Sequence, residues 1–178
     1  MKPLEVFDHY RTAWSDIGVH LPWLRDHAHG KVLEIGVRDG ISTGALLVGV
    51  AHRGGHVWSV DTEDRSGLYD DEDYSKLWTF IQANSHSESD KVLESMGQTD
   101  SNFQIDLLFI DGDHTQWGAM CDLTTYGPWA KVIAIHDINS RFSGVWEAAI
   151  SYFRWKENGP FSKAEFFNAS HGLGVIYR

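Results

Sequence analysis

A glycine turn flanked by carboxylates is the first stretch of the chain that could bind a ligand. Residues 31–42 read Lys-Val-Leu-Glu-Ile-Gly-Val-Arg-Asp-Gly-Ile-Ser, and an apolar run rich in helix formers follows them. This order predicts a buried strand, a tight turn and a helix. Gly36 and Gly40 let the backbone approach a ligand closely. Glu34 and Asp39 surround the same space with carboxylates.

The acidic turn favours a cationic ligand with hydroxyl groups over a pyrophosphate. A dinucleotide-binding turn would follow Gly-x-Gly-x-x-Gly, whose bare backbone holds phosphate groups, whereas this turn follows Glu-x-Gly-x-x-x-Gly. The next apolar run, residues 57–60, ends on Asp61. An acidic side chain at the carboxyl end of the second strand can accept both ribose hydroxyls. Together these features suit a sulfonium-bearing nucleoside with an amino-acid tail.

Two later apolar runs also end in polar side chains. Residues 105–110 and 130–135 are fit for neighbouring parallel strands, and ligands bind at the carboxyl ends of such strands. Burying polar groups there costs several kcal/mol unless they are satisfied, so the cluster is expected to have a function. The side chains that follow the two runs are Asp111, Asp113, His114, His136 and Asp137.

The apolar patterns also predict the elements that position these residues. The last two strands are joined by a short link, which predicts a terminal antiparallel hairpin. The fold class is therefore α/β: a single Rossmann-like three-layer α/β/α domain with a mostly parallel seven-stranded sheet. We expect strands over 32–35, 57–60, 91–96, 105–110, 130–135, 164–168 and 173–177, and helices over 43–52, 73–84, 117–124 and 143–155.

Residues 1–29 are predicted to form a helical extension in front of a domain that spans 30–178. Apolar residues recur at helical spacing from Leu4 to Trp14, and a second short helix follows. These helices would cover one flank of the sheet or act as a lid over the substrate. The histidines of this extension lie in a polar connector and are interpreted as solvated: His20, His27 and His29.

From residue 31 to residue 178 the chain resembles the class I S-adenosylmethionine-dependent methyltransferases, and the glycine turn resembles their motif I. The resemblance implies S-adenosyl-L-methionine as the cofactor and a seven-stranded sheet that closes with an antiparallel hairpin. It also implies that polar side chains in the segment 97–100 lie beside the adenine. The predicted cofactor-binding residues are Glu34, Gly36, Val37, Arg38, Asp39, Gly40, Ser42, Asp61, Gln98 and Asp111.

Within that superfamily the chain looks like the small-molecule O-methyltransferases that use a divalent metal, including the catechol-type and antibiotic-pathway enzymes. Catechol-type enzymes carry a metal aspartate after the fourth strand, which Asp111 matches, and a catalytic lysine three positions later, where this chain has His114. Their Asp-Asn pair after the fifth strand is His136-Asp137 here. The resemblance thus implies Asp111, His136 and Asp137 as ligands of Mg²⁺ or another divalent metal. The histidine favours a softer ion than magnesium.

The chemistry of methyl transfer assigns roles to the same cluster. Transfer from a sulfonium needs an in-line nucleophile near the methyl carbon, so positioning supplies much of the acceleration. A hydroxyl acceptor must also lose its proton, and histidine, with a pKa of roughly 6.5, suits a general base near neutral pH. A metal on Asp111 and Asp137 could lower the pKa of the acceptor. The candidate catalytic residues are His114, Asp111 and His136.

Composition limits the cellular setting and the partners. The chain has 178 residues and 42% hydrophobic residues, which is the size of one domain with a sizeable core. Its formal charge of −10 lacks the basic footprint of a nucleic-acid binder. The single cysteine, Cys121, excludes an intrachain disulfide framework and fits a reducing cytoplasm. No apolar run reaches the roughly 20 residues that cross a bilayer, so we expect a cytoplasmic protein without a membrane partner.

The sequence is best interpreted as an S-adenosylmethionine-dependent methyltransferase that acts on a hydroxyl of a small molecule. Two other classes stay open: a cofactor-binding protein without turnover that serves as a regulatory or assembly subunit, and a metal-dependent hydrolase built on the Asp/His cluster. Methylation of nucleic-acid bases is disfavoured, because no Asn/Asp-Pro-Pro-Tyr/Phe motif follows the fourth strand. The motifs do not name the acceptor, and a homo-oligomer is compatible with the sequence.

Overall fold

A twisted sheet forms the centre of the computed structural model, which describes residues 1–99, 101–139, 143–156 and 162–178. Within these residues the sheet has seven strands in the order β3-β2-β1-β4-β5-β7-β6. The first five in this order run parallel, whereas β7 is antiparallel to both β5 and β6. The strands are β1 (Gly30–Ile35), β2 (Gly55–Asp61), β3 (Trp78–Gln82), β4 (Ile105–Ile110), β5 (Ala130–His136), β6 (Lys163–Phe167) and β7 (Leu173–Tyr177).

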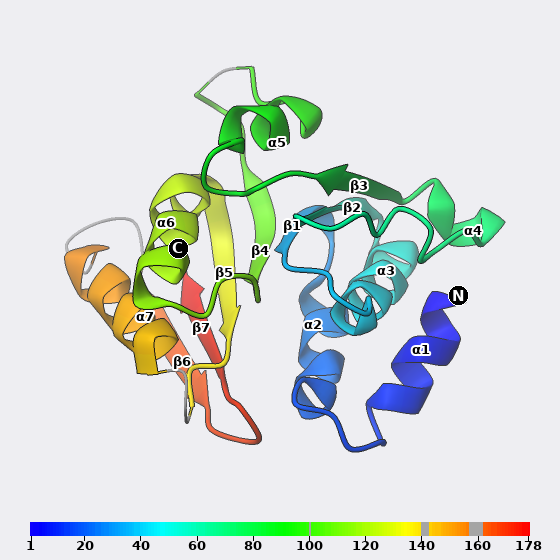
Figure 1. Ribbon diagram of the computed structural model, residues 1–178, viewed down its shortest axis with the longest axis horizontal. Helices are drawn as coiled ribbons and strands as arrows, with labels where there is room; N and C mark the ends of the chain where they lie inside the picture. Colours follow the sequence, from blue (N-terminus) through cyan, green and yellow to red (C-terminus); the bar gives the residue numbers. More distant parts are fainter. Residues whose placement is uncertain (100, 140–142, 157–161) are drawn as a thin grey trace.

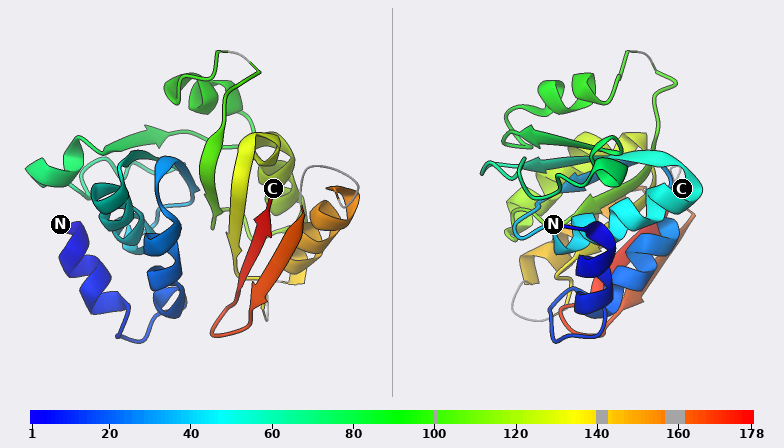
Figure 2. Two further views of the ribbon diagram at one scale, coloured as in Figure 1. Left: turned by 180° about the vertical axis from the view of Figure 1, so that it is seen from behind. Right: turned by 90° about the vertical axis from the view of Figure 1, so that its right-hand side faces the viewer.

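Helices cover both faces of the sheet and complete the predicted three-layer α/β/α arrangement (Figures 1 and 2). Helices α1, α2 and α3 cover one face, and α5, α6 and α7 cover the other. The helices are α1 (Pro3–Tyr10), η1 (Gly18–His20), α2 (Leu21–His27), α3 (Ile41–Arg53), α4 (Glu72–Ser75), α5 (Ser89–Ser95), α6 (Gln116–Tyr126), η2 (Gly127–Trp129) and α7 (Ser143–Lys156).

The core consists of two apolar clusters, one on each face of the sheet. Because successive side chains of a strand point to opposite faces, β4 contributes Leu107 and Phe109 to the cluster beneath α2 and α3. Two of its other residues, Leu108 and Ile110, belong to the cluster on the side of α6 and α7. All four side chains are buried, which explains why residues 107–110 of β4 read as a continuous apolar run. Among the described residues, no helix combines the length and apolar character that crossing a membrane requires.

Two predicted elements are wrong, and both lie between β2 and β4. The segment predicted as a helix over 73–84 is helical only in α4 and continues as the edge strand β3, which pairs in parallel with β2. Trp78 and Ile81 are buried at a spacing that also fits a helix, so backbone pairing with β2 decided the structure. The segment predicted as a strand over 91–96 is α5. Its buried residues Val92 and Met96 lie four positions apart, as a helix requires.

The first 29 residues pack on the sheet through α3. Helices α1 and α2 both contact α3, and Phe7, Leu21 and Leu24 are buried in the core. One of the histidines expected to be solvated is not: His20 is 4% exposed, and its Nε2 lies 3.0 Å from the carbonyl oxygen of Ala169. The long-range contact with the β6–β7 turn, which local polarity could not reveal, accounts for this burial.

Candidate active site

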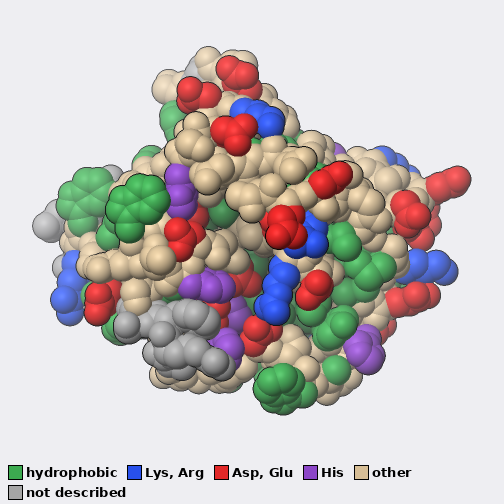
Figure 3. Space-filling model, in the orientation of Figure 1, with side chains coloured by type: hydrophobic (Ala, Val, Ile, Leu, Met, Phe, Trp, Pro, Cys, Tyr) green, Lys and Arg blue, Asp and Glu red, His purple; other side chains and the backbone are tan. Residues whose placement is uncertain are grey.

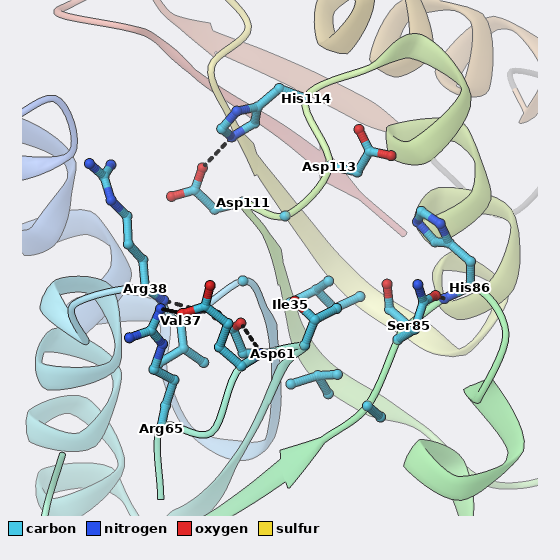
Figure 4. A pocket seen from close by; sticks show the side chains of 17 residues that line it. Ile35, Val37, Arg38, Asp61, Arg65, Ser85, His86, Asp111, Asp113 and His114 are labelled. Carbon is cyan, nitrogen blue, oxygen red and sulfur yellow. Dashed lines mark hydrogen bonds and ion pairs between the residues drawn. The ribbon is translucent and has the colours of Figure 1, made fainter. Parts of the chain in front are cut away.

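The carboxyl ends of the parallel strands enclose a cavity of about 470 Å³. Figure 4 shows its walls, which come from the turn after β1, the ends of β2 and β4, and the segment after β3. A smaller cavity of about 80 Å³ adjoins it and shares the walls formed by the β1 turn and by the end of β4. On this face of the molecule, histidine and acidic side chains gather beside Lys and Arg side chains (Figure 3).

The predicted site residues fall into two groups. Most line a cavity: Gly36, Val37, Arg38, Asp61, Asp111, Asp113, His114, Asp39, Ser42 and Asp137. Four predicted residues are described by the structure but line neither cavity: Glu34, Gly40, Gln98 and His136. Gln98 follows α5, because the predicted third strand is a helix, and Asp100 lies outside the described residues. The part of the cavity wall that was expected from the segment 97–100 is formed instead by the residues after β3: Ala83, Asn84, Ser85 and His86.

Gly36 makes the close approach between the β1 turn and the end of β4. Its φ is +90°, and a Cβ atom there would lie 2.2 Å from the carbonyl oxygen of Asp111. Both facts require glycine. Arg38 and Gly40 also have positive φ values, of 50° and 77°, so the backbone turns sharply before α3 begins. The turn thus brings its own backbone against the strand that carries Asp111.

We expect Gly36→Ala to destabilise the protein by about 3 kcal/mol, because backbone strain and a clash with Asp111 add together. Gly54→Ala is the matched control: Gly54 has φ +78° but nothing within 4 Å of the added Cβ. Urea unfolding of the two variants separates the clash from the cost of positive φ. Equal losses in both variants would contradict the close-approach role of Gly36.

Glu34 is a buried anchor beneath the turn. Its carboxylate is 0% exposed and accepts hydrogen bonds from the hydroxyls of Ser42, Thr43 and Ser59 at 2.6–2.7 Å. Trp78 in turn donates its indole N–H to the Ser59 hydroxyl. The network ties β1 to β2, β3 and the first turn of α3. The side chain therefore shapes the turn from below, and does not line the cavity as the sequence had suggested.

The anchor predicts a pH dependence of stability, because burial raises the pKa of Glu34 from its ordinary value of 4.5 to about 7. The folded state binds this proton more tightly than the unfolded chain does. The resulting stabilisation is fully present below pH 4.5 and is lost as the pH rises through about 7. The free energy of unfolding should fall by on the order of 3 kcal/mol over that window.

We expect Glu34→Gln, which cannot ionise, to lack this decline in stability. The measurement is urea unfolding at several pH values between 4.5 and 7, with Glu72→Gln, an exposed position, as the control. A Glu34→Gln variant with the pH slope of the wild type would contradict the assignment.

Asp61 lies at the end of β2, in the wall of the larger cavity. Its Oδ2 accepts hydrogen bonds from the backbone N–H groups of Val37 and Arg38 at 2.9 and 3.0 Å, and its Oδ1 accepts one from Glu63 at 2.9 Å. Burial alone would raise the pKa of Asp61, but these backbone donors outweigh it and hold the pKa below its usual range. Asp61 is thus an ionised acceptor that also fixes the β1 turn.

The ends of β4 and β5 form an alternating cluster of carboxylates and imidazoles. Nδ1 of His136 lies 3.2 Å from Oδ1 of Asp111. Nε2 of His114 lies 3.4 Å from the same oxygen, a contact that Figure 4 shows as a dashed line. Nε2 of His114 also lies 3.1 Å from Oδ2 of Asp137. His136 and Asp137 are 2% and 3% exposed. Four of the five residues predicted at the two strand ends therefore meet at one place. Asp113 is not part of this cluster, and its Oδ1 accepts a hydrogen bond from the backbone N–H of Thr115 at 2.9 Å.

The pKa values of Asp111, His114 and His136 favour their charged forms, whereas that of Asp137 favours its neutral form. Burial opposes the ionisation of Asp111, but contacts with His114 and His136 hold its pKa below the usual range. The hydrogen bond with Asp111 raises the pKa of His114. Burial would lower the pKa of His136, yet its contact with Asp111 and the nearby carboxylates raise it. Burial raises the pKa of Asp137 despite its histidine neighbours.

The same cluster has a donor set that fits a divalent metal. One ligand atom from each of Asp111, His136 and Asp137 lies within 4.8 Å of the other two. Asp137 adopts a left-handed backbone with φ 61°, which is unusual for a residue other than glycine and clusters at functional sites. Two carboxylates and one imidazole suit Mn²⁺, Fe²⁺, Co²⁺ or Zn²⁺ better than an all-oxygen site would. The residues present are therefore competent to hold such an ion.

Several residues of the site were missed by sequence reasoning. Asn84, Ser85 and His86 were missed because β3 was taken for a helix. Asp16 lines the smaller cavity from the loop before η1, and no local pattern marks it. His171 reaches Asp137 from the β6–β7 turn. The predicted terminal hairpin could have indicated His171, because pairing of β7 with β5 places the β6–β7 turn beside the end of β5.

Comparisons with known proteins agree with this geometry. A family model described as a methyltransferase domain matches residues 33–138, which is more than half of the chain. The chain belongs to this methyltransferase family. The match runs from β1 to the residue after Asp137 and so contains the glycine turn, Asp61 and the cluster at the ends of β4 and β5. A comparison with curated proteins gives no match.

Solved structures share the fold of this methyltransferase at low sequence identity. A Podospora anserina methyltransferase bound to SAH is 15% identical with a TM-score of 0.63, and 99% of this chain and 88% of that chain are covered. An O-methyltransferase from Bacillus cereus in complex with SAH is 15% identical with a TM-score of 0.64, at 99% and 89% coverage. CalS11, a TDP-rhamnose 3′-O-methyltransferase of calicheamicin biosynthesis, is 14% identical with a TM-score of 0.62, at 89% and 76% coverage.

Proposed function

We propose that this methyltransferase uses S-adenosylmethionine and transfers its methyl group to a hydroxyl of a small molecule. The observation that carries the proposal is the continuity of the site. One cavity extends from the acidic ribose candidate Asp61 to Asp111 and His114 at the end of β4. A cofactor that spans it would place its nucleoside at β2 and its sulfonium beside the Asp/His cluster. Two of the solved relatives are bound to SAH, the demethylated cofactor.

In the proposed reaction, the acceptor oxygen forms a bond to the methyl carbon as the bond from that carbon to sulfur breaks. The neutral form of His114 takes the proton of the acceptor hydroxyl. Asp111 and Asp137 lie 3.4 and 3.1 Å from its Nε2 and stabilise the imidazolium that results. The rest of the acceleration comes from holding the acceptor in line with the methyl group.

A divalent metal would be held by Asp111, His136 and Asp137. When bound, it would supply a positive charge that lowers the pKa of an acceptor hydroxyl. Asp111 and His136 would act in the reaction as ligands of this metal, and their contact with each other would hold both side chains in place. An acceptor with hydroxyl groups suits the polar walls of the smaller cavity, which include Asp16 and Asp39.

Calorimetric titration with S-adenosylmethionine and SAH, with and without Mg²⁺ and Mn²⁺, tests the cofactor. Transfer of a labelled methyl group to a panel of hydroxylated small molecules then tests the reaction. We expect binding of both compounds and transfer that His114→Ala removes. Absence of binding would overturn the proposal. Tight binding of the cofactor without methyl transfer to any compound of the panel, together with unchanged cofactor binding in His114→Ala, would favour the regulatory alternative.

A further inference from the structure

The imidazole of His171 reaches the candidate metal cluster from the turn between the last two strands of the sheet. His171 belongs to the turn between the two terminal strands, β6 and β7, and its Nδ1 lies 2.9 Å from Oδ1 of Asp137. The metal ligands implied by the family resemblance come only from the ends of β4 and β5. The antiparallel pairing of β7 with β5 makes the additional contact, because it places Leu173 opposite His136.

The β6–β7 turn is fixed in place by contacts with the end of β5 and with the N-terminal extension. The backbone N–H of Asn139 donates to the carbonyl oxygen of His171 at 2.7 Å, and its side-chain amide donates to Asn168 at 2.8 Å. Gly172 has φ +84°, and a Cβ there would lie 2.7 Å from Cβ of Asn139. His20 contacts the carbonyl oxygen of Ala169. The position of His171 is therefore set by the fold.

The two oxygens of Asp137 have separate neighbours. Oδ1 lies 2.9 Å from Nδ1 of His171 and 3.6 Å from Nδ1 of His136, whereas Oδ2 lies 3.1 Å from Nε2 of His114. The side chain is 4% exposed, so little water can replace a lost partner. A hydrogen bond to one oxygen of a carboxylate fixes its rotation and directs the other oxygen. Partners of this kind orient metal ligands and tune their affinity.

We propose that His171 is a positioning residue that donates its Nδ1–H to Asp137 and so holds this carboxylate in place for a divalent metal. The inference rests on the proposed function, since it concerns the metal set of the same site. It adds the β6–β7 turn to the site. It also gives the buried contact between His20 and that turn a role in supporting the site.

Titration of the full-length protein with Co²⁺, followed by calorimetry and by the visible absorption of the bound ion, tests this proposal. We expect His171→Ala to weaken Co²⁺ binding by about 10- to 100-fold and to change the absorption bands. His171→Asn keeps an N–H donor near the position of Nδ1 and should recover most of the affinity. His29→Ala removes an exposed histidine and should bind Co²⁺ like the wild type.

Binding of SAH by the same variants separates this inference from the proposed function. We expect an unchanged SAH affinity in His171→Ala, which also shows that the variant is folded. Wild-type Co²⁺ affinity and absorption in His171→Ala would overturn the inference, as would equal losses in the Ala and Asn variants. Failure of the wild type to bind Co²⁺ while it binds SAH would overturn it and leave the cofactor assignment standing. Failure to bind SAH would refute the proposed function itself.

Discussion

Asp61→Ala is expected to weaken the binding of SAH by at least about 100-fold. Hydrogen bonds to a charged group contribute roughly 1.5–3 kcal/mol each, and the proposed cofactor loses two of them with the carboxylate. The substitution also releases the backbone N–H groups of Val37, Arg38 and Glu63, which the carboxylate now holds. The turn around Gly36 would then lose part of its order. Calorimetric titration with SAH measures the effect.

Two further variants make this experiment specific. Asp73→Ala removes an exposed carboxylate from the same acidic stretch and controls for the change in net charge. Asp61→Asn keeps the shape of the side chain but not its charge, so it should fall between the wild type and Asp61→Ala. An SAH affinity in Asp61→Ala equal to that of the wild type would refute the ribose assignment.

Asp137→Ala is expected to leave the affinity for SAH unchanged and to reduce methyl transfer by on the order of 100-fold or more. The substitution removes a candidate metal ligand and one of the two carboxylates that stabilise the imidazolium of His114. It leaves the β1 turn and Asp61 untouched, because Asp137 lies at the end of β5. The pair of measurements is SAH calorimetry and single-turnover transfer to the acceptor identified from the panel.

This prediction separates the two ends of the site. If Asp137→Ala weakened SAH binding as much as Asp61→Ala did, the cluster would belong to the cofactor site. Full transfer activity in Asp137→Ala would show that neither a metal on this residue nor its contact with His114 serves the reaction. Asp73→Ala again provides the control for lost charge.

The sequence was sufficient for six of the seven strands and for most of the strand ends. The runs before Gly36 and Asp111 are mostly apolar and are interrupted only by Glu34 and Asp106, because both faces of those strands are buried. Such runs are the strongest local signal of a parallel sheet. The order of the apolar runs along the chain and the short link between the last two strands then predict a mostly parallel sheet with a terminal hairpin. The predicted mostly parallel seven-stranded sheet with its antiparallel hairpin is confirmed.

The parts that sequence reasoning missed depend on contacts between distant segments. Strand β3 lies at an edge, and its residues Trp78 and Ile81 fit a helical spacing, so pairing with β2 was needed to place Asn84 and His86. The burial of Glu34 could not be predicted, because an acidic residue at a strand end has the same local pattern whether it faces a cavity or three hydroxyls. The contact of His171 with Asp137 likewise depends on how the terminal hairpin packs.

We propose that the glycine turn after β1 and the acidic end of β2 bind a cationic nucleoside, and that the ends of β4 and β5 act on the methyl acceptor. A crystal structure of the protein with SAH tests it most directly. We predict the ribose hydroxyls on Asp61 and the sulfur facing Asp111 and His114. An empty cavity beside Gly36, or SAH bound at another place on the molecule, would contradict the claim.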